Sequence, residues 1–250
     1  MMSRKPLNRK CYGHIPHLSG SRMINPGDHR CNIGDEIRAT IKPKDRHDRI
    51  IVLEKLDGTS VGVGKMDGIC IPLVKSGYLA TSSKYLQHRL FANWVYENVQ
   101  RFDKLLNNGE RVCGEWLAMA HSTRYKLKHE PFVIFDIMVE DTRVCFPDVI
   151  ERVSKFGFVT PHIIHLGCPL SVDETMNALG TYGFHGAIDP IEGAVWRIER
   201  NELVRKWETF GPRKWIVENL VKYVRPDKKD GIYFREREKD NTWNWYPKKE

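Results

Sequence analysis

The sequence has no long hydrophobic run, no closely paired cysteines and no internal repeat. No stretch approaches the roughly 18 uninterrupted apolar residues that a membrane span requires, and the first residues lack the apolar core of a signal peptide. We therefore expect a cytoplasmic protein that does not associate with membranes. The six cysteines are scattered without a CxxC pair, which argues against a disulfide framework or a zinc ribbon.

The chain does have enough apolar residues for a core, and it carries an excess of positive charge. Hydrophobic types make up 41% of its 250 residues, and 40 Lys and Arg against 32 Asp and Glu give a formal net charge of +8. This balance favours a polyanionic partner such as nucleic acid. A few N-terminal residues could ligate zinc, but they lack the tight pairs of typical zinc sites, so a covering loop is the preferred interpretation. These residues are Cys11, His14, His17, His29 and Cys31.

Short β-type runs dominate the hydrophobic pattern. Apolar residues at steps of three or four predict a helix within 82–106, with an aromatic stripe that is expected to pack in the core. Further helices are expected over 147–157 and after the capping box at 171–174. The pattern indicates an α+β fold rich in strands. The strands are expected at 49–54, 59–65, 69–74, 111–118, 132–140, 194–199, 203–207 and 219–224.

The sharpest local signal is Lys55, which ends a hydrophobic strand and is followed at once by the tight turn Asp57-Gly58. Such a lysine is held rigidly. It can act as a nucleophile only if neighbouring cations, burial or a metal lower the pKa of its amine. Lys65 and Lys228 also precede an x-Asp-Gly turn, but we interpret them as ordinary hairpin and loop lysines from their context.

Four further residues stand in strands where their chemistry is unusual. Glu115 places a carboxylate inside an apolar strand, where an unpaired charge is costly. Phe135 offers an aromatic ring that could stack on a purine. Glu192 lies at the entrance of a strand, and Lys222 lies near the end of another, three residues before Arg225.

The segments around Lys55, Glu115, Phe135, Glu192 and Lys222 resemble, in this order, motifs I, III, IIIa, IV and V of the covalent nucleotidyltransferase superfamily. They are most similar to the ATP-dependent RNA ligases of that superfamily. The resemblance extends from about Glu54 to Asp230. It implies an α+β nucleotidyltransferase fold in which antiparallel sheets are flanked by helices and the ATP site lies between the sheets. It also implies a basic, irregular segment over 1–48 packed on a nucleotidyltransferase domain over 49–234, followed by a charged aromatic tail over 235–250.

The resemblance implies a role for each matching residue. Lys55 would attack the α-phosphate of ATP and hold AMP, with Mg²⁺ as the metal and Mn²⁺ as a possible substitute. Lys75 stands in the region where the family has an arginine, and Lys206 is a rival to the favoured Lys222 for phosphate contact. In the remaining roles, Glu54 would face the adenine, Glu115 would bind the ribose, Phe135 would stack on the base, Glu192 and Glu115 would hold the metal, and Asp57 and Gly58 would complete the nucleotide-binding turn.

The function implied by the resemblance is RNA ligation by a monomeric enzyme: AMP moves from Lys55 to an RNA 5′-phosphate, and a 3′-hydroxyl then displaces it. Too few residues follow Arg225 for an OB domain, which favours RNA ligases over a minimal DNA ligase or a GTP-using capping guanylyltransferase. A basic nucleic-acid-binding module with a degenerate fold is the non-enzyme alternative, against which the intact lysine and carboxylates count. Trp243, Trp245 and Tyr246 could stack on bases, but packing of the tail onto the domain is preferred.

Overall fold

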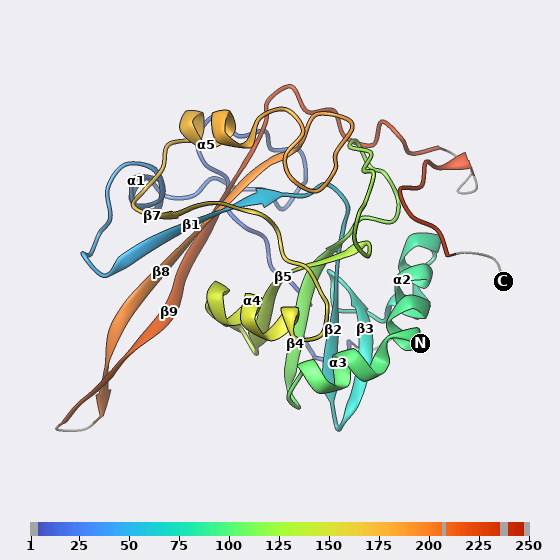
Figure 1. Ribbon diagram of the computed structural model, residues 1–250, viewed down its shortest axis with the longest axis horizontal. Helices are drawn as coiled ribbons and strands as arrows, with labels where there is room; N and C mark the ends of the chain where they lie inside the picture. Colours follow the sequence, from blue (N-terminus) through green and yellow to red (C-terminus); the bar gives the residue numbers. More distant parts are fainter. Residues whose placement is uncertain (1–4, 207–208, 236–239, 248–250) are drawn as a thin grey trace.

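Two antiparallel sheets and the helices around them form the fold, which confirms the α+β expectation (Figure 1). The computed structural model describes residues 5–206, 209–235 and 240–247. The four-stranded sheet has the order β7-β1-β8-β9, and the five-stranded sheet has the order β3-β2-β4-β5-β6. The strands are β1 (Asp48–Lys55), β2 (Thr59–Met66), β3 (Ile69–Val74), β4 (Glu110–Trp116), β5 (Phe132–Val139), β6 (Thr142–Arg143), β7 (Ile163–Gly167), β8 (Gly193–Lys206) and β9 (Thr209–Val224).

The chain crosses from one sheet to the other directly after Lys55, since β1 belongs to the four-stranded sheet and β2 to the five-stranded sheet. The turn between β1 and β2, which contains Gly58, lies very close to β4. A Cβ atom on Gly58 would lie only 2.6 Å from the carbonyl oxygen of Trp116, so this position accepts no larger residue without a shift of backbone. The tight turn therefore fixes the end of β1 against the second sheet.

The main core lies between the five-stranded sheet and its helices. Ile51 and Leu53 of β1 join this core from the other sheet. Large aromatic rings fill it, and the centroids of Trp94 and Trp116 are 5.5 Å apart. The expected core role of the aromatic stripe is confirmed for Phe91, Trp94 and Phe102, whereas Tyr85 at its start is 50% exposed. The helices are α1 (Ile33–Thr40), the 3-10 turn η1 (Ala80–Ser82), α2 (Leu86–Glu97), α3 (Val99–Leu105), α4 (Phe146–Ser154) and α5 (Val172–Leu179).

Three expectations about the elements need correction. The helix expected within 82–106 is divided at Asn98, whose side-chain amide donates to the carbonyl of Trp94 at 2.9 Å and ends α2. The strands expected at 194–199 and 203–207 are one strand, β8, because the pairing with β9 continues through 200–203. Trp207 lies outside the described residues. The segment 1–48, expected to be irregular, contains α1, which Asn32 caps through a bond from the backbone N–H of Asp35 at 2.8 Å.

Both ends of the described chain pack against the sheets. The backbone of His17 forms a bridge with Lys222 of β9, and the N–H of Leu18 donates to the carbonyl of Lys222 at 2.9 Å. In the C-terminal tail, the ring centroid of Trp245 lies 5.5 Å from that of Trp116. Packing of the tail, the preferred interpretation, is therefore confirmed for this tryptophan. Among the described helices, none is long and apolar enough to cross a membrane.

Candidate active site

Lys55 is the last residue of β1, and its side chain meets the carboxylate of the residue that directly precedes the neighbouring strand β8. The pairing of β1 with β8 places Lys55 opposite Gly193, and the Nζ atom lies 2.6 Å from Oε2 of Glu192. Gly193 is required here because its Cβ would lie 1.9 Å from the carbonyl oxygen of Tyr223. The close approach of β8 and β9 therefore determines where Glu192 stands.

A second carboxylate approaches Lys55 from the other sheet. Glu115 of β4 accepts a hydrogen bond from the backbone N–H of Gly58 at 3.1 Å, in the turn that follows Lys55. Burial raises the pKa of Glu115 to about 7, helped by Glu192 and opposed by Lys55. Burial also raises the pKa of Glu192. Two carboxylates with raised pKa values beside a lysine are typical of a binding or catalytic centre.

The charge of Lys55 depends on these carboxylates. Burial alone lowers the pKa of the amine, but Glu192 and Glu115 outweigh burial, so the pKa is raised above its ordinary value. The amine is therefore protonated at neutral pH in the protein without ligands. A reaction at this nitrogen requires that the influence of the carboxylates be reduced.

Two more lysines face the same centre. Burial lowers the pKa of Lys75 and of Lys222, and the positive charge of Lys55 lowers both further. Lys222 lies in β9 opposite Val195, and its Nζ is 3.5 Å from Oδ1 of Asp28. Lys55, Lys75 and Lys222 thus bring three positive charges close together, and this arrangement suits the binding of phosphates.

The N-terminal segment contributes Asp28, which the sequence did not indicate, and His17, which the sequence indicated only as a possible zinc ligand. Asp28 is held by the backbone N–H groups of Ile24 and Asn25, and these bonds keep its pKa below the usual range despite burial. Its Oδ1 is 3.3 Å from Nε2 of His17, which is buried. No local spacing links this segment to Lys222. Backbone contacts with β9, among them the His17 bridge and the bond from the N–H of Leu18, bring the groups together.

Three of the five residues considered as zinc ligands have other side-chain contacts. The sulfur of Cys11 lies 3.9 Å from that of Cys113, His17 bonds Ser21 through Nδ1 at 2.7 Å, and His29 contacts the carbonyl of Gly27. Within the described part of the chain, no three or more His, Cys, Asp or Glu residues form a group that could hold a metal ion.

Phe135 lies beside the lysine cluster. Its ring packs edge to face on Tyr12 with centroids 4.9 Å apart, and the backbone N–H of Tyr12 donates to the carbonyl of Lys75 at 3.3 Å. The ring of Phe135 is half-buried. It therefore has an accessible surface near the cations, as a stacking partner for a base requires.

Glu54 and Lys206 are not brought into this cluster. Side chains alternate along a strand, and Glu54 turns to the opposite face of β1 from Lys55. There its Oε2 accepts a hydrogen bond from the N–H of Phe184 at 2.9 Å, and burial raises its pKa to about 7. Lys206 stands opposite Thr209 at the far end of the protruding β8–β9 hairpin (Figure 1). Thirteen strand residues beyond Gly193 correspond to roughly 40 Å.

Lys228 is not the ordinary loop lysine that its sequence context suggested. It is 4% exposed, and its Nζ lies 3.0 Å from Oδ2 of Asp57 and donates to Thr123 Oγ1. The reason is the turn after β9, in which the N–H of Lys228 bonds the carbonyl of Arg225 at 3.2 Å and directs the side chain inward. Asp57 also accepts from the N–H of Ser122 at 2.9 Å. Its carboxylate thus secures the turn after Lys55.

This buried pair leads to a stability prediction. We expect Lys228→Met to lower the free energy of unfolding by about 3 kcal/mol, because it leaves the Asp57 carboxylate buried without its partner. The exposed neighbour Lys229 supplies a matched control, and Lys229→Met should change the value by less than about 0.5 kcal/mol. Urea unfolding of both variants measures the difference. Equal effects of the two substitutions would contradict this account of Lys228.

The site thus places one lysine beside two carboxylates, with two further lysines nearby. Residues 48–243 match the family model of RNA ligase, so the chain belongs to the RNA ligase family. No match was found among curated proteins.

Solved structures similar to this chain include RNA ligases. An archaeal ATP-dependent RNA ligase is 14% identical, with 71% of this chain and 42% of that chain covered and a TM-score of 0.43. A mutant of the Naegleria gruberi RNA ligase with ATP and Mn is 16% identical, with 71% and 50% covered and a TM-score of 0.48. The same ligase with PPi is 18% identical, with 60% and 46% covered and a TM-score of 0.44. The present chain thus spans about half the length of these relatives or less.

Proposed function

We propose that the protein is an ATP-dependent RNA ligase that forms a covalent AMP adduct on Lys55. The observation that carries this proposal is the position of the Lys55 amine, 2.6 Å from Glu192 and close to Glu115, in a chain of the RNA ligase family. In the first step, the neutral amine attacks the α-phosphorus of ATP. A nitrogen–phosphorus bond forms, the bond to the bridging oxygen breaks, pyrophosphate leaves with that oxygen, and the nitrogen releases a proton to give the phosphoramidate.

The other residues of the cluster position the nucleotide. Lys75 and Lys222 provide positive charge for the phosphate oxygens, and Phe135 supplies a ring for the adenine. Glu115 accepts a hydrogen bond from the ribose. Gly58 and Asp57 hold the turn that presents Lys55. We do not assign Glu54 or Lys206 to this set, since Glu54 accepts a hydrogen bond from Phe184 and the backbone of Lys206 pairs with Thr209.

The carboxylates suit a divalent cation. Mg²⁺ is usually bound by one or two carboxylates together with substrate phosphates, and Glu192 with Glu115 supplies these oxygen ligands. When bound, the cation would add positive charge that favours the neutral form of the Lys55 amine and stabilises the leaving pyrophosphate. Mn²⁺ has the same preference for oxygen ligands.

The proposed substrate is an RNA with a 5′-phosphate and a 3′-hydroxyl. AMP passes from Lys55 to the 5′-phosphate, and the 3′-hydroxyl then attacks this activated phosphate and releases AMP. The family supports RNA as the substrate, and the net charge of +8 supports a polyanion. We propose that the protein acts as a monomer in the cytoplasm.

One experiment tests the function and separates the alternatives. The protein is incubated with α-labelled ATP or GTP and magnesium, and the adduct is then offered RNA or nicked DNA. We expect label from ATP and sealing of RNA. Label from GTP would indicate a capping guanylyltransferase, sealing of DNA alone would indicate a DNA ligase, and the absence of any label would indicate a binding module.

A further inference from the structure

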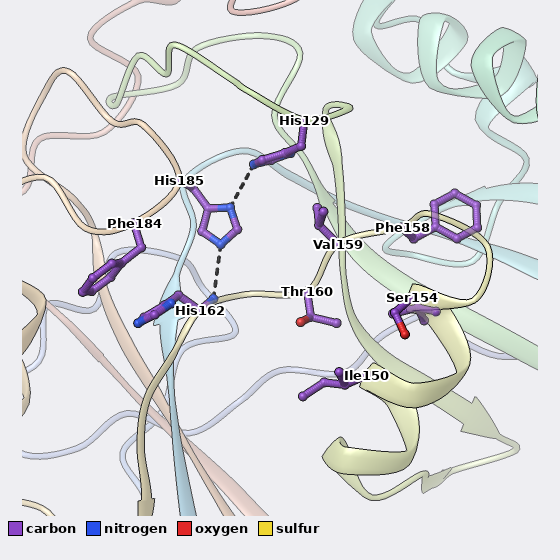
Figure 2. Close-up of a pocket in the computed structure, with 10 residues that line it drawn as sticks. His129, Ile150, Ser154, Phe158, Val159, Thr160, His162, Phe184 and His185 are labelled. Atoms are coloured by element: carbon purple, nitrogen blue, oxygen red, sulfur yellow. Dashed lines mark hydrogen bonds between the residues drawn. The ribbon is translucent and has the colours of Figure 1, made fainter.

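A cavity of about 380 Å³ opens beside the residues that contact Glu54. This volume is within the range of ligand sites, roughly 300–1,000 Å³. One wall is apolar and comes from Ile150 and Val153 of α4 with Phe158 and Val159, which follow that helix. The opposite wall carries histidines and Phe184 (Figure 2). None of the side chains that line the cavity is a lysine, arginine, aspartate or glutamate.

A chain of hydrogen bonds determines which nitrogens of two histidines donate and which accept. The backbone N–H of His162 can only donate, so Nε2 of His185 accepts from it at 3.2 Å and Nδ1 of His185 donates to Nε2 of His129 at 2.9 Å. Nδ1 of His129 donates in turn to the carbonyl of Glu130 at 2.6 Å. Burial and the neighbouring histidines lower the pKa of His185 to about 4. These assignments follow from the network of partners.

The ring of His162 remains available to a ligand. It stacks on Phe184 with centroids 3.7 Å apart and an interplanar angle of 20°, and Phe184 is 53% exposed. Among the described residues, no hydrogen-bond partner is found for the ring nitrogens of His162. The hydroxyl of Thr160 also lines the cavity (Figure 2). The site thus combines flat uncharged rings with a few polar groups, which suits a planar neutral ligand.

The rim of the cavity adds positive charge. The N–H of Lys126 donates to the carbonyl of Gly186 at 2.8 Å, next to His185. Lys128 directly precedes His129, and the side chains of both lysines are exposed. The cavity is lined by flat, uncharged rings, and lysines lie on its rim. This arrangement suits a nucleobase that enters the cavity while the phosphodiester groups on either side of it stay outside. A nucleoside triphosphate, by contrast, needs cations within its site, and these stand at Lys55.

From this geometry we propose that the cavity binds an unpaired nucleobase of the RNA substrate, stacked on Phe184 and His162, with the adjacent phosphates near Lys126 and Lys128. The inference rests on the proposed function and specifies how its RNA is held. The backbone of the two stacking residues is bonded to Glu54, because the N–H of Glu54 donates to the carbonyl of His162 at 3.0 Å. The subsite is therefore anchored one residue from Lys55.

The test uses 5′-phosphorylated RNA that carries the fluorescent base 2-aminopurine at successive positions. We expect quenching at one position with the unaltered protein and its loss with Phe184→Leu. The same substitution should weaken RNA binding about tenfold and leave adenylation of Lys55 unchanged. Tyr182, two residues away and 55% exposed but outside the lining, is the matched aromatic control, and Tyr182→Leu should leave both quenching and affinity intact.

Each result decides the inference. If Phe184→Leu lost adenylation but kept its affinity for RNA, the cavity would be the site for the adenine of ATP. That result would overturn the inference that the cavity binds an RNA base. Equal RNA affinities of Phe184→Leu and the unaltered protein would also overturn it. Failure of the unaltered protein to form an AMP adduct would instead count against the proposed function, so the two failures are distinguishable.

Discussion

Lys55→Ala is expected to abolish the covalent AMP adduct. The attacking atom must be an amine within the carboxylate centre, and Lys55 is the lysine whose Nζ contacts Glu192 at 2.6 Å. Incubation with α-labelled ATP and magnesium, followed by denaturing electrophoresis, measures the adduct. Mass spectrometry of the unaltered protein should place AMP on Lys55.

Two further variants test whether a positive charge alone, or any lysine before an x-Asp-Gly turn, is enough for adduct formation. Lys55→Arg keeps the positive charge, but a guanidinium does not lose its proton in a protein, so the adduct should still be absent. Lys65→Ala should retain nearly full adduct formation. Lys65 precedes the same type of turn, but its Nζ contacts Asp103 of α3 at 2.6 Å. An adduct mapped to Lys75 or Lys222 would contradict the assignment of the nucleophile.

The strands that carry Lys55, Glu115 and Phe135 could be predicted within about two residues, because alternating apolar residues and adjacent turns are local signals. The positions of Lys55, Glu115 and Lys222 in one centre could not be predicted from periodicity. They depend on which strands become neighbours, and the ordered motifs of the family supplied that expectation.

Residues that reach the site from loops were missed or misread. Asp28 lies far from Lys222 in sequence, and its position depends on the backbone bridge between His17 and β9. Lys228 follows a proline within a charged segment, which normally indicates solvent exposure, yet the turn after β9 buries its side chain against Asp57. In both cases tertiary contacts override local composition.

The placements of Glu54 and Lys206 have simple geometric reasons. Adjacent residues of a strand point to opposite faces, so Glu54 does not share the face of Lys55. Lys206 became a candidate because two separate strands were expected, at 194–199 and 203–207. Since β8 continues through this region, Lys206 is carried to the end of the hairpin and away from the site.

The charge state that the protein favours for Lys55 is not the one that the reaction needs. Glu192 stabilises the ammonium form, whereas attack on phosphorus requires the neutral amine. Below its pKa, the neutral fraction of an amine rises about tenfold for each pH unit. Adenylation should therefore accelerate as the pH rises, and Glu192 affects both the position of the amine and the pH at which it reacts.

Glu192→Gln separates these two effects. The maximal adenylation rate should fall at least about a hundredfold, because the variant loses the charge that orients Lys55 and holds the divalent cation. At the same time, removal of the carboxylate lowers the pKa of Lys55, so the midpoint of the pH–rate profile should move to lower pH. Single-turnover adenylation measured across pH gives both quantities.

The matched control for this experiment is Glu202→Gln. Glu202 lies in β8, the strand that Glu192 directly precedes, and its exposed carboxylate is 3.8 Å from the guanidinium of Arg200. It should leave both the maximal rate and the pH midpoint unchanged. A loss smaller than threefold in Glu192→Gln, with the melting temperature unaltered, would place Glu192 outside the active centre. A midpoint that moves to higher pH would mean that Glu192 does not stabilise the ammonium form of Lys55, and the two carboxylates would then need different roles.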